Sequence, residues 1–217
     1  PQPDRYGEQP LDTTGGPAKH LHRQGGFVIP DGLLHRAGFK AFPQQPVLGT
    51  VGFNFPWKCY VRLAVETREA GWALVLLSNN ASPEDESRWK QLNPSTLVVT
   101  GFLPSETIVN YLAGCDATAF MYECANTGTS GAIRQGIAAR KPVIALETCR
   151  QFRDLFEMQA PLWWTHDWTE LREVLGKVSP GRFDSAIHAL AEQDSWTRLG
   201  GKYAGLYRSL LADQEGR

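Results

Sequence analysis

Residues 127–145 read TGTSGAIRQGIAARKPVIA, and their pattern predicts a turn, a helix and a buried strand in succession. Hydroxyl residues and glycines crowd the expected start of the helix. Free backbone N–H groups and the helix dipole make such a start a site for an anion, and the glycines leave room for a phosphate group. A capped structural helix is the alternative, but two glycines in the first turns cost helix stability. The stretch therefore favours a phosphate site at a helix start, followed by a strand within a sheet.

On both sides of this stretch, short apolar runs alternate with amphipathic stretches. The run ALVLLS is typical of a strand buried on both faces of a parallel sheet. Strands are expected at residues 47–53, 73–78, 96–102, 116–122, 142–146 and 162–164. Helices are expected at residues 57–70, 82–92, 104–113, 129–140, 152–158, 169–178, 180–192 and 196–213. This alternation predicts an α/β fold, a Rossmann-like doubly wound parallel sheet of about six strands with flanking helices.

The composition is that of a globular protein. The chain has 217 residues, of which 42% are hydrophobic and 21% charged, a length that suits one α/β domain with appendages or at most two small domains. The net charge of -1 does not favour a nucleic-acid partner. Residues 1–45 are predicted to form an irregular arm, with a short strand and a turn expected within residues 26–34. Residues 46–217 are predicted to form the Rossmann-like domain with its C-terminal helices.

Cysteine usage and hydropathy indicate a cytoplasmic protein. Four cysteines lie in the chain without CxxC spacing, which favours reduced thiols over disulfides or a bound metal. No apolar run approaches the roughly 18 residues that a membrane span needs, and the polar, proline-rich start has no signal-peptide pattern. Because the first residue is Pro1 rather than a methionine, the question of whether further residues precede it remains open.

The loops after the expected strands are the places to search for a ligand site, because open α/β sheets bind ligands outside the carboxyl ends of their strands. After the first strand, Gly52 lets a ligand approach the backbone and Lys58 could reach a phosphate, although a tight turn with a solvated lysine explains both equally well. After the second strand, Ser78 and Asn79 could line a pocket or simply form a polar loop.

Two later loops complete the candidate site. In GFLPSE, residues 101–106, the backbone around Phe102 and Leu103 could hold the edge of a nucleobase, with a helix-start turn as the equal alternative. In NTGTSGAIR, residues 126–134, hydroxyl groups and glycines surround the expected phosphate position. The GxxxxGK[ST] and GxGxxG patterns are absent from the sequence, which disfavours a nucleoside triphosphatase and a nicotinamide-dependent oxidoreductase.

Taken in order, four segments resemble the C-terminal, donor-binding domain of retaining glycosyltransferases with the GT-B fold. They are LGTVGFNFPWK, ALVLLS, VVTGFLPSETIVNYLAGCDATAFMY and SGAIRQGIAARKPVIA. The resemblance covers about residues 47–156. Two runs are its most specific parts: the first begins with GFLP and ends with CDA, and the second begins with SGAIR and ends with KPVIA. It implies a single GT-B half that binds a nucleotide-diphosphate sugar for transfer to an unknown acceptor. It further implies no metal or other cofactor, and a separate acceptor-binding domain or subunit as partner.

The resemblance also implies roles for individual residues. Lys58 matches the lysine that contacts the diphosphate, the helix start takes the phosphates, and the backbone at Phe102 and Leu103 holds the base. The candidate substrate-binding residues are Gly52, Phe53, Asn54, Ser78, Asn79, Phe102, Leu103, Thr127, Gly128, Thr129, Ser130, Gly131 and Gln135.

The chain departs from the family's pattern at its charged positions. Phe53 stands beside the first-strand glycine, where the family often has a basic residue. Thr127 and Gln135 stand where the family often has two glutamates, and only Gln135 could still hydrogen-bond a ribose. Glu123 is a candidate substitute carboxylate, so Lys58 and Glu123 are the candidate catalytic residues. Two functions therefore remain open: the donor-binding half of a glycosyltransferase, or a catalytically inactive GT-B-like domain that serves as a binding or assembly module.

Overall fold

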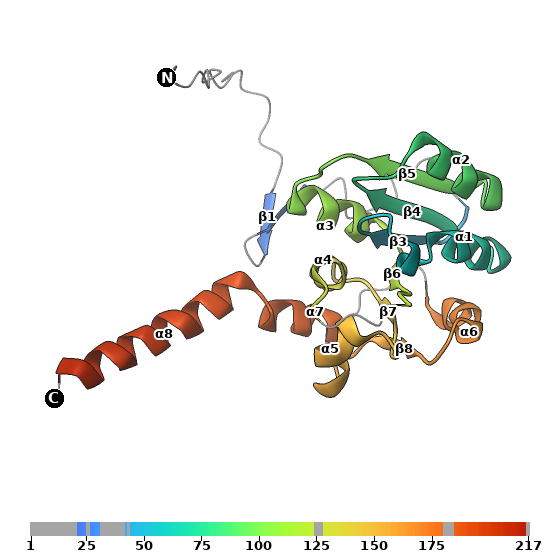
Figure 1. Cartoon of the computed structure of the whole chain (residues 1–217). Coiled ribbons are helices and arrows are strands. Elements are labelled where there is room, and N and C mark those ends of the chain that lie inside the picture. Colours follow the sequence, from blue (N-terminus) through green and yellow to red (C-terminus); the bar gives the residue numbers. More distant parts are fainter. Residues whose placement is uncertain are drawn as a thin grey trace, which may run out of the picture.

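The computed structural model describes residues 21–24, 27–30, 42, 44–123, 128–179 and 185–215, and its centre is a six-stranded sheet (Figure 1). In chain order its strands are β3 (Val47–Val51), β4 (Ala73–Ser78), β5 (Thr96–Thr100), β6 (Ala117–Phe120), β7 (Val143–Leu146) and β8 (Trp163–Thr165). They lie side by side in the order β5-β4-β3-β6-β7-β8, and each neighbouring pair is parallel. The order reverses between β3 and β6, which is where open α/β sheets place their ligands. The predicted fold class is therefore confirmed.

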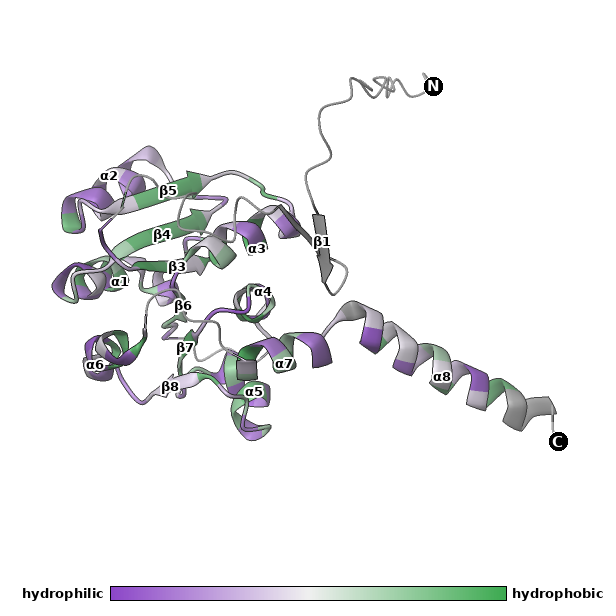
Figure 2. Cartoon of the chain, turned by 180° about the vertical axis from the view of Figure 1, so that it is seen from behind, coloured by the Kyte–Doolittle hydropathy of each residue, from purple (hydrophilic) through white to green (hydrophobic). Residues whose placement is uncertain are grey.

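Helices cover both faces of this sheet. They are α1 (Tyr60–Glu69), α2 (Pro83–Leu92), α3 (Ser105–Gly114), α4 (Gly131–Ala138), α5 (Arg153–Glu157), α6 (Thr169–Lys177) and α7 (Ser185–Gln193). The chain also forms the 3₁₀ turns η2 (Pro56–Lys58) and η3 (Arg150–Phe152) and a last helix, α8 (Trp196–Glu215). The buried side chains of α1, α2 and α6 belong to one core, and those of α3, α4, α5 and α7 belong to the other. Figure 2 shows the matching hydropathy, with apolar strands inside and polar helix faces outside.

The alternation of side chains along β4 explains why two cores form. Val75 and Leu77 pack into the core under α3 and α4, whereas Leu74 and Leu76 pack into the core under α1 and α2. Because successive side chains of a strand point to opposite faces, a strand that is apolar at every position must be covered on both sides. The continuous apolar run therefore requires the helices on both faces.

Close packing of α4 against β6 depends on a glycine. A Cβ atom built on Gly136 would lie 2.6 Å from the Cζ atom of Phe120, whose side chain is fully buried. Because real Cβ contacts are never that short, only glycine lets α4 approach the sheet this closely. This approach sets the position of the start of α4.

Several boundaries differ from the prediction. Strand β3 ends at Val51, and α1 begins only at Tyr60 because Pro56–Lys58 forms a 3₁₀ turn and Cys59 is left-handed. Helix α4 spans Gly131–Ala138 rather than residues 129–140. Of the helix predicted at residues 180–192, residues 180–184 lie outside the described part and α7 covers the rest.

Two short strands lie within the stretch predicted to be an irregular arm. Strands β1 (Leu21–Gln24) and β2 (Phe27–Pro30) pair in antiparallel fashion, and the expected strand within residues 26–34 corresponds to β2. In the sequence Gly25-Gly26 separates them, and a Gly-Gly pair is a signal for a two-residue hairpin loop. The division of the chain at residue 45 remains a prediction.

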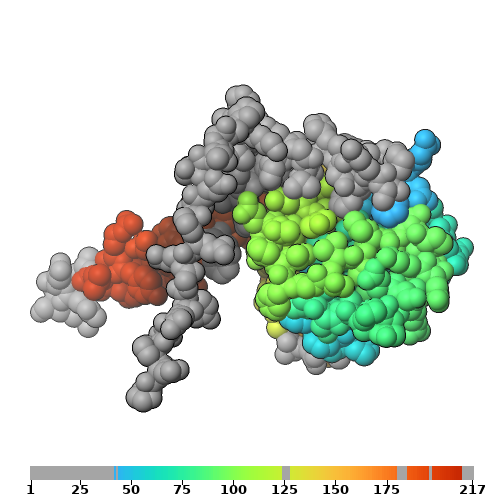
Figure 3. All heavy atoms as spheres, turned by 90° about the horizontal axis from the view of Figure 1, so that it is seen from above, coloured from blue at the N-terminus to red at the C-terminus, as the bar shows by residue number. Residues whose placement is uncertain are grey.

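The C-terminal helix α8 projects away from the sheet and its flanking helices (Figures 1 and 3). Among the described helices, none is both long enough and apolar enough to cross a membrane.

Candidate functional site

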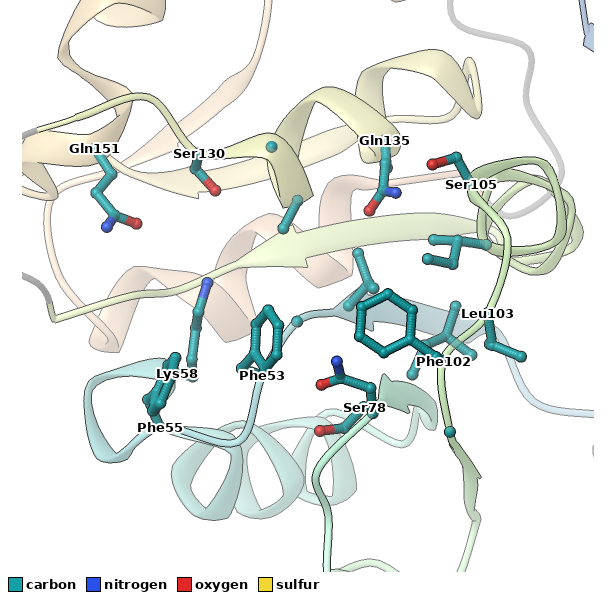
Figure 4. Close-up of a pocket in the computed structure, with 18 of the residues that line it drawn as sticks. Phe53, Phe55, Lys58, Ser78, Phe102, Leu103, Ser105, Ser130, Gln135 and Gln151 are labelled. Carbon is teal, nitrogen blue, oxygen red and sulfur yellow. The ribbon is translucent and has the colours of Figure 1, made fainter. Parts of the chain in front are cut away.

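A cavity of about 480 Å³ lies outside the carboxyl ends of the central strands. Its lining comes from the loops after β3, β4 and β5, from the start of α4 and from η3 (Figure 4). These are the ends of strands on both sides of the point where the strand order reverses. The cavity therefore occupies the position that this fold reserves for ligands.

Gly52 forms the floor of the cavity at the end of β3. Its φ of +149° is rarely adopted by other residues, and a Cβ atom there would lie 2.9 Å from the Tyr60 hydroxyl and 3.4 Å from Lys58 Nζ. The Gly52 N–H donates to the carbonyl of Leu77, which ties the loop to β4. A glycine is thus needed both for the backbone conformation and for the space above it.

Lys58 is buried at the cavity wall, with only 7% of its surface exposed. The η2 turn carries it, and its Nζ lies 3.2 Å from the centroid of the Tyr122 ring. Tyr122 donates a hydrogen bond to the Val51 carbonyl at 2.9 Å, and burial raises the pKa of this phenol well above its usual value. The ring therefore stays neutral and presents a π face that stabilises the ammonium.

The start of α4 faces this lysine. Ser130 is the N-cap residue, its side chain makes no capping hydrogen bond, and no acidic residue lies in the first turn. The first N–H groups of a helix have no partner within the helix and carry the positive end of its dipole. Nothing lies within 4 Å of a Cβ atom built on Gly131, so the approach to these groups is open.

The charge of the cavity is positive. Among the described residues that line it, Lys58 is the only charged one, and no Asp or Glu side chain is among them. A buried ammonium and a helix start that share one cavity make the electrostatic potential favourable for an anion.

Aromatic rings form one wall of the cavity. The rings of Phe53 and Phe55 stack with centroids 5.6 Å apart, and those of Phe55 and Trp57 stack at 4.3 Å. We call Phe53, Phe55 and Trp57 the aromatic ladder. Phe102 lines the cavity from the β5 side and is 89% exposed. Such exposed rings at a cavity mouth mark a surface that a ligand can cover.

Polar groups after β4 stabilise the loops of the site. Ser78 donates a hydrogen bond to the side-chain oxygen of Asn80 at 3.3 Å, and the same oxygen accepts the backbone N–H of Asn54 at 2.5 Å. This interaction joins the loop after β3 to the loop after β4. Asn79 lines the cavity, and its side-chain oxygen is buried without a hydrogen-bond partner among the described residues.

Most of the residues predicted from the sequence meet at this cavity. Those that line it are Gly52, Phe53, Lys58, Ser78, Asn79, Phe102, Leu103, Thr129, Ser130, Gly131 and Gln135. Three others do not line it: Asn54 uses its N–H to bind Asn80, Gly128 is exposed with a φ of +129°, and Glu123 is a surface residue. The predicted role of Thr127 falls outside the described residues.

Glu123, the candidate catalytic carboxylate, takes part in a surface ion pair. One of its carboxylate oxygens lies 3.4 Å from Nη1 of Arg62, and the side chains of both residues are half exposed. Its backbone N–H donates to the carbonyl of Trp57. The geometry therefore gives Glu123 a place beside α1 and not in the wall of the cavity.

Some lining residues were not predicted from the sequence. Gln151 lies in η3, after β7, and its backbone carbonyl accepts the Ser130 N–H at 3.4 Å. Phe55, Trp57 and Ser105 also line the cavity. Ligands of this fold bind at the carboxyl ends of the strands, and the same rule applied to the loop after β7 would have indicated Gln151. For the aromatic ladder, the alternation of rings in FNFPW was the available signal.

The described residues contain neither a cluster of metal-binding side chains nor a disulfide. In the described part of the chain, no group of three or more His, Cys, Asp or Glu side chains is placed to hold a metal ion. Cys59, Cys115 and Cys149 are not disulfide-bonded, and burial raises the pKa of Cys115. Cys124 lies outside the described residues.

The strand order and the helices on both faces of the sheet are those of one Rossmann-like half of the GT-B fold, as the sequence resemblance predicts. No protein-family model matches the chain, and no curated protein is similar to it in sequence. Solved structures do match it, at sequence identities that show the fold alone.

One matching structure is AviGT4, a glycosyltransferase involved in avilamycin A biosynthesis, with a TM-score of 0.53 and 17% identity over 81% of this chain and 54% of that one. Another is HepE from Anabaena in complex with UDP and glucose, with a TM-score of 0.57 and 16% identity over 78% of this chain and 50% of that one. A third is sucrose-phosphate synthase from Thermosynechococcus elongatus, with a TM-score of 0.54 and 16% identity over 78% and 46%. The chain thus spans about half the length of the structures that it matches.

Proposed function

We propose that this chain binds a nucleotide-diphosphate sugar in the cavity and acts as the donor-binding half of a retaining glycosyltransferase. One observation carries the proposal: the buried ammonium of Lys58 and the uncapped start of α4 line the same cavity, at the switch point of the sheet. A diphosphate between them would receive a charge-assisted contact from Lys58 and backbone N–H donors from α4. The fold shared with HepE, whose structure contains UDP and glucose, supports the same ligand class.

Burial makes this single cation effective. An ammonium that is largely withdrawn from water has less hydration to lose when a ligand arrives, and its charge is screened less than a surface charge. The absence of carboxylates among the described lining residues removes a source of repulsion. These features favour a diphosphate over a neutral or cationic ligand.

In the proposed reaction, the chain stabilises the leaving group. When the bond from the sugar to the diphosphate breaks, negative charge develops on the phosphate oxygen, and Lys58 and the α4 start stabilise that charge without a metal ion. The acceptor and the groups that orient it would come from a second domain or subunit, and the transfer step would depend on holding the two substrates together.

Isothermal titration calorimetry with UDP, GDP, ADP and their hexose conjugates tests the proposal. Wild-type protein should bind at least one of these nucleotides or its hexose conjugate. Lys58→Met should weaken that binding about tenfold or more, because it removes a charge-assisted contact. Lys177→Met is the matched control, since Lys177 is exposed and pairs with Glu173 on α6. Failure of all these compounds to bind at millimolar concentration would overturn the proposal.

A second candidate function is a catalytically inactive binding or assembly module. Its support is the lining of the cavity. Gln135 is part of that lining, and no carboxylate is found among the described lining residues. A module of this kind would bind the nucleotide sugar and leave it intact. Robust hydrolysis or transfer by the isolated chain, measured as release of the nucleoside diphosphate, would exclude this candidate.

A further inference from the structure

Tyr122 is a buried aromatic residue that lies behind the Lys58 ammonium. Lys58 lines the cavity, whereas Tyr122 belongs to the core under α3 and α4, is 0% exposed and is not among the lining residues. The Nζ atom of Lys58 lies 3.2 Å from the centroid of the Tyr122 ring. Figure 4 shows the Lys58 side chain reaching into the cavity toward Ser130. The ring therefore contacts the ammonium from the core side and leaves its cavity side to a ligand.

Contacts with three elements of the fold hold the Tyr122 ring in place. The Tyr122 hydroxyl donates to the carbonyl of Val51, the last residue of β3, at 2.9 Å. The ring also packs against the rings of Phe120 in β6 and Phe152 in η3, with centroids 5.9 and 5.3 Å away. Because a side chain in a close-packed core keeps a single position on average, the ring is in place before a ligand arrives.

The segment that carries Tyr122 also fixes the turn that carries the lysine. The backbone N–H of Glu123 donates to the carbonyl of Trp57, the residue before Lys58, at 2.9 Å. A free lysine side chain has many rotamers, and ordering it on binding costs affinity. Contacts that order both the η2 turn and the Lys58 ammonium in the unbound protein reduce that cost.

We propose that Tyr122 is a positioning residue for the diphosphate, a role that rests on the proposed function: its ring holds the Lys58 ammonium at the cavity wall, where the phosphate oxygens would meet it. An aromatic ring attracts a cation through its quadrupole and leaves the charge of the cation in place, whereas a carboxylate partner would neutralise it. Tyr122 itself does not reach the cavity. Its effect on nucleotide affinity is therefore transmitted through Lys58.

A double-mutant cycle tests whether Tyr122 acts through Lys58. Calorimetry gives the dissociation constants of UDP, ADP and GDP for wild type, Tyr122→Leu, Lys58→Met and the protein with both substitutions. For the nucleotide that binds most tightly, Tyr122→Leu should weaken binding about three- to tenfold in the wild-type background. The same substitution should change the affinity by less than about twofold where Lys58 is already methionine, because the group through which it acts is gone.

Trp168→Leu is the matched control. Trp168 is also buried, and its ring lies 4.8 Å from the guanidinium carbon of Arg62, so the variant removes a ring from a second contact between a cation and an aromatic face. Neither Trp168 nor Arg62 lines the cavity. Nucleotide affinity should therefore stay within about twofold of wild type.

A change in ring electronics at nearly constant shape separates the cation contact from packing. Tyr122→Phe keeps an aromatic face against the ammonium, whereas pentafluorophenylalanine at position 122 withdraws negative charge from that face. The fluorinated protein should bind the nucleotide about three- to tenfold more weakly than Tyr122→Phe. Equal affinities in these two proteins would overturn the inference.

The NMR signal of the Lys58 side chain gives a readout that needs no substitution of Tyr122. In wild type, the methylene protons next to Nζ should resonate upfield of those of the other lysines, because they lie over the ring, and should stay upfield when nucleotide is bound. Loss of the signal in Lys58→Met assigns it. If a thermal melt shows that Tyr122→Leu does not fold, this signal and the fluorinated protein decide the outcome.

Three results would overturn the inference and leave the proposed function in place. They are a Lys58 signal at the ordinary lysine position, unchanged affinity in folded Tyr122→Leu, and an equal effect of Tyr122→Leu with and without Lys58. A wild-type protein that binds none of the three nucleotides or their hexose conjugates would overturn both.

Discussion

Replacing Gly136 with alanine should destabilise the protein, because this glycine sets the distance between α4 and β6. The added Cβ atom would meet the ring of Phe120, with its Cζ atom at 2.6 Å, and the Thr118 hydroxyl oxygen at 3.1 Å. Ordinary van der Waals contact begins at 3.4 Å, so the ring or the helix must move by most of an ångström. Both Phe120 and Thr118 are fully buried in the sheet.

The net cost can be worked out from two opposing effects. Overpacking a well-packed core costs about 1–3 kcal/mol, whereas alanine gains about 1 kcal/mol over glycine in a helix interior. Because the clash involves a fully buried ring, we expect overpacking near its upper limit and a net loss of about 2 kcal/mol. For a domain of this size, that loss lowers the melting temperature by about 4–8 °C.

Urea unfolding and differential scanning calorimetry measure this effect, and Gly176→Ala provides a control of opposite sign. Gly176 is exposed on α6 and a Cβ atom there would meet nothing within 4 Å, so the variant should gain about 0.5–1 kcal/mol from helix propensity alone. A Gly136→Ala protein as stable as wild type would refute the packing of α4 described above. It would also remove the reason for the position of the anion site.

Two further predictions concern local contacts. Ser82→Ala should lower the free energy of unfolding by about 1 kcal/mol, because it breaks the reciprocal capping box that Ser82 and Asp85 form at the start of α2; an unchanged urea midpoint would argue against that cap. Hydrogen bonding and charge from Glu147 raise the pKa of His166 above its ordinary value of 6.5. The stabilisation from this pair is therefore complete below about pH 6.5 and is lost as the pH rises through the folded-state pKa. Glu147→Gln should lower the NMR-measured pKa of His166 toward 6.5, and the same pKa in both proteins would contradict the contact.

The sheet could be predicted from the sequence because its strands carry a strong signal. ALVLLS is apolar at every position, and only a strand covered on both faces uses such a run efficiently. The end of β3 was harder to place, since Phe53 continues the apolar pattern after the chain has already turned at Gly52. Side-chain pattern does not report the backbone conformation that ends a strand.

The candidate site was predictable where it depends on strand ends, and less so where it depends on tertiary contacts. Gly52, Ser78 and Phe102 lie at the carboxyl ends of predicted strands and line the cavity as the topology requires. The burial of Lys58 could not be predicted, because the Tyr122 ring that covers its ammonium comes from the segment after β6. A lysine in a turn has no local feature that separates a solvated side chain from a buried one.

Gln151 and Glu123 are two residues whose positions could not be predicted from the sequence. Gln151 follows β7 without any accompanying glycine or charge pattern, yet η3 brings it to the cavity. Glu123 follows β6 and is close in sequence to the phosphate-binding turn, but its carboxylate pairs with Arg62 of α1. Sequence proximity to a site does not determine the direction of a side chain.

The most direct test of the central claim is amide chemical-shift mapping of the ¹⁵N-labelled chain titrated with UDP, ADP and GDP. One of these nucleotides should produce its largest shifts at the amides of Ser130, Gly131 and Ala132, with further shifts at Gly52 and Lys58, because those backbone groups surround the proposed diphosphate. Lys58→Met should reduce the shifts at equal ligand concentration. No shifts with any of the three, or largest shifts at Glu192, Asp194 and Leu199, which line a separate groove beside α7 and α8, would contradict the account.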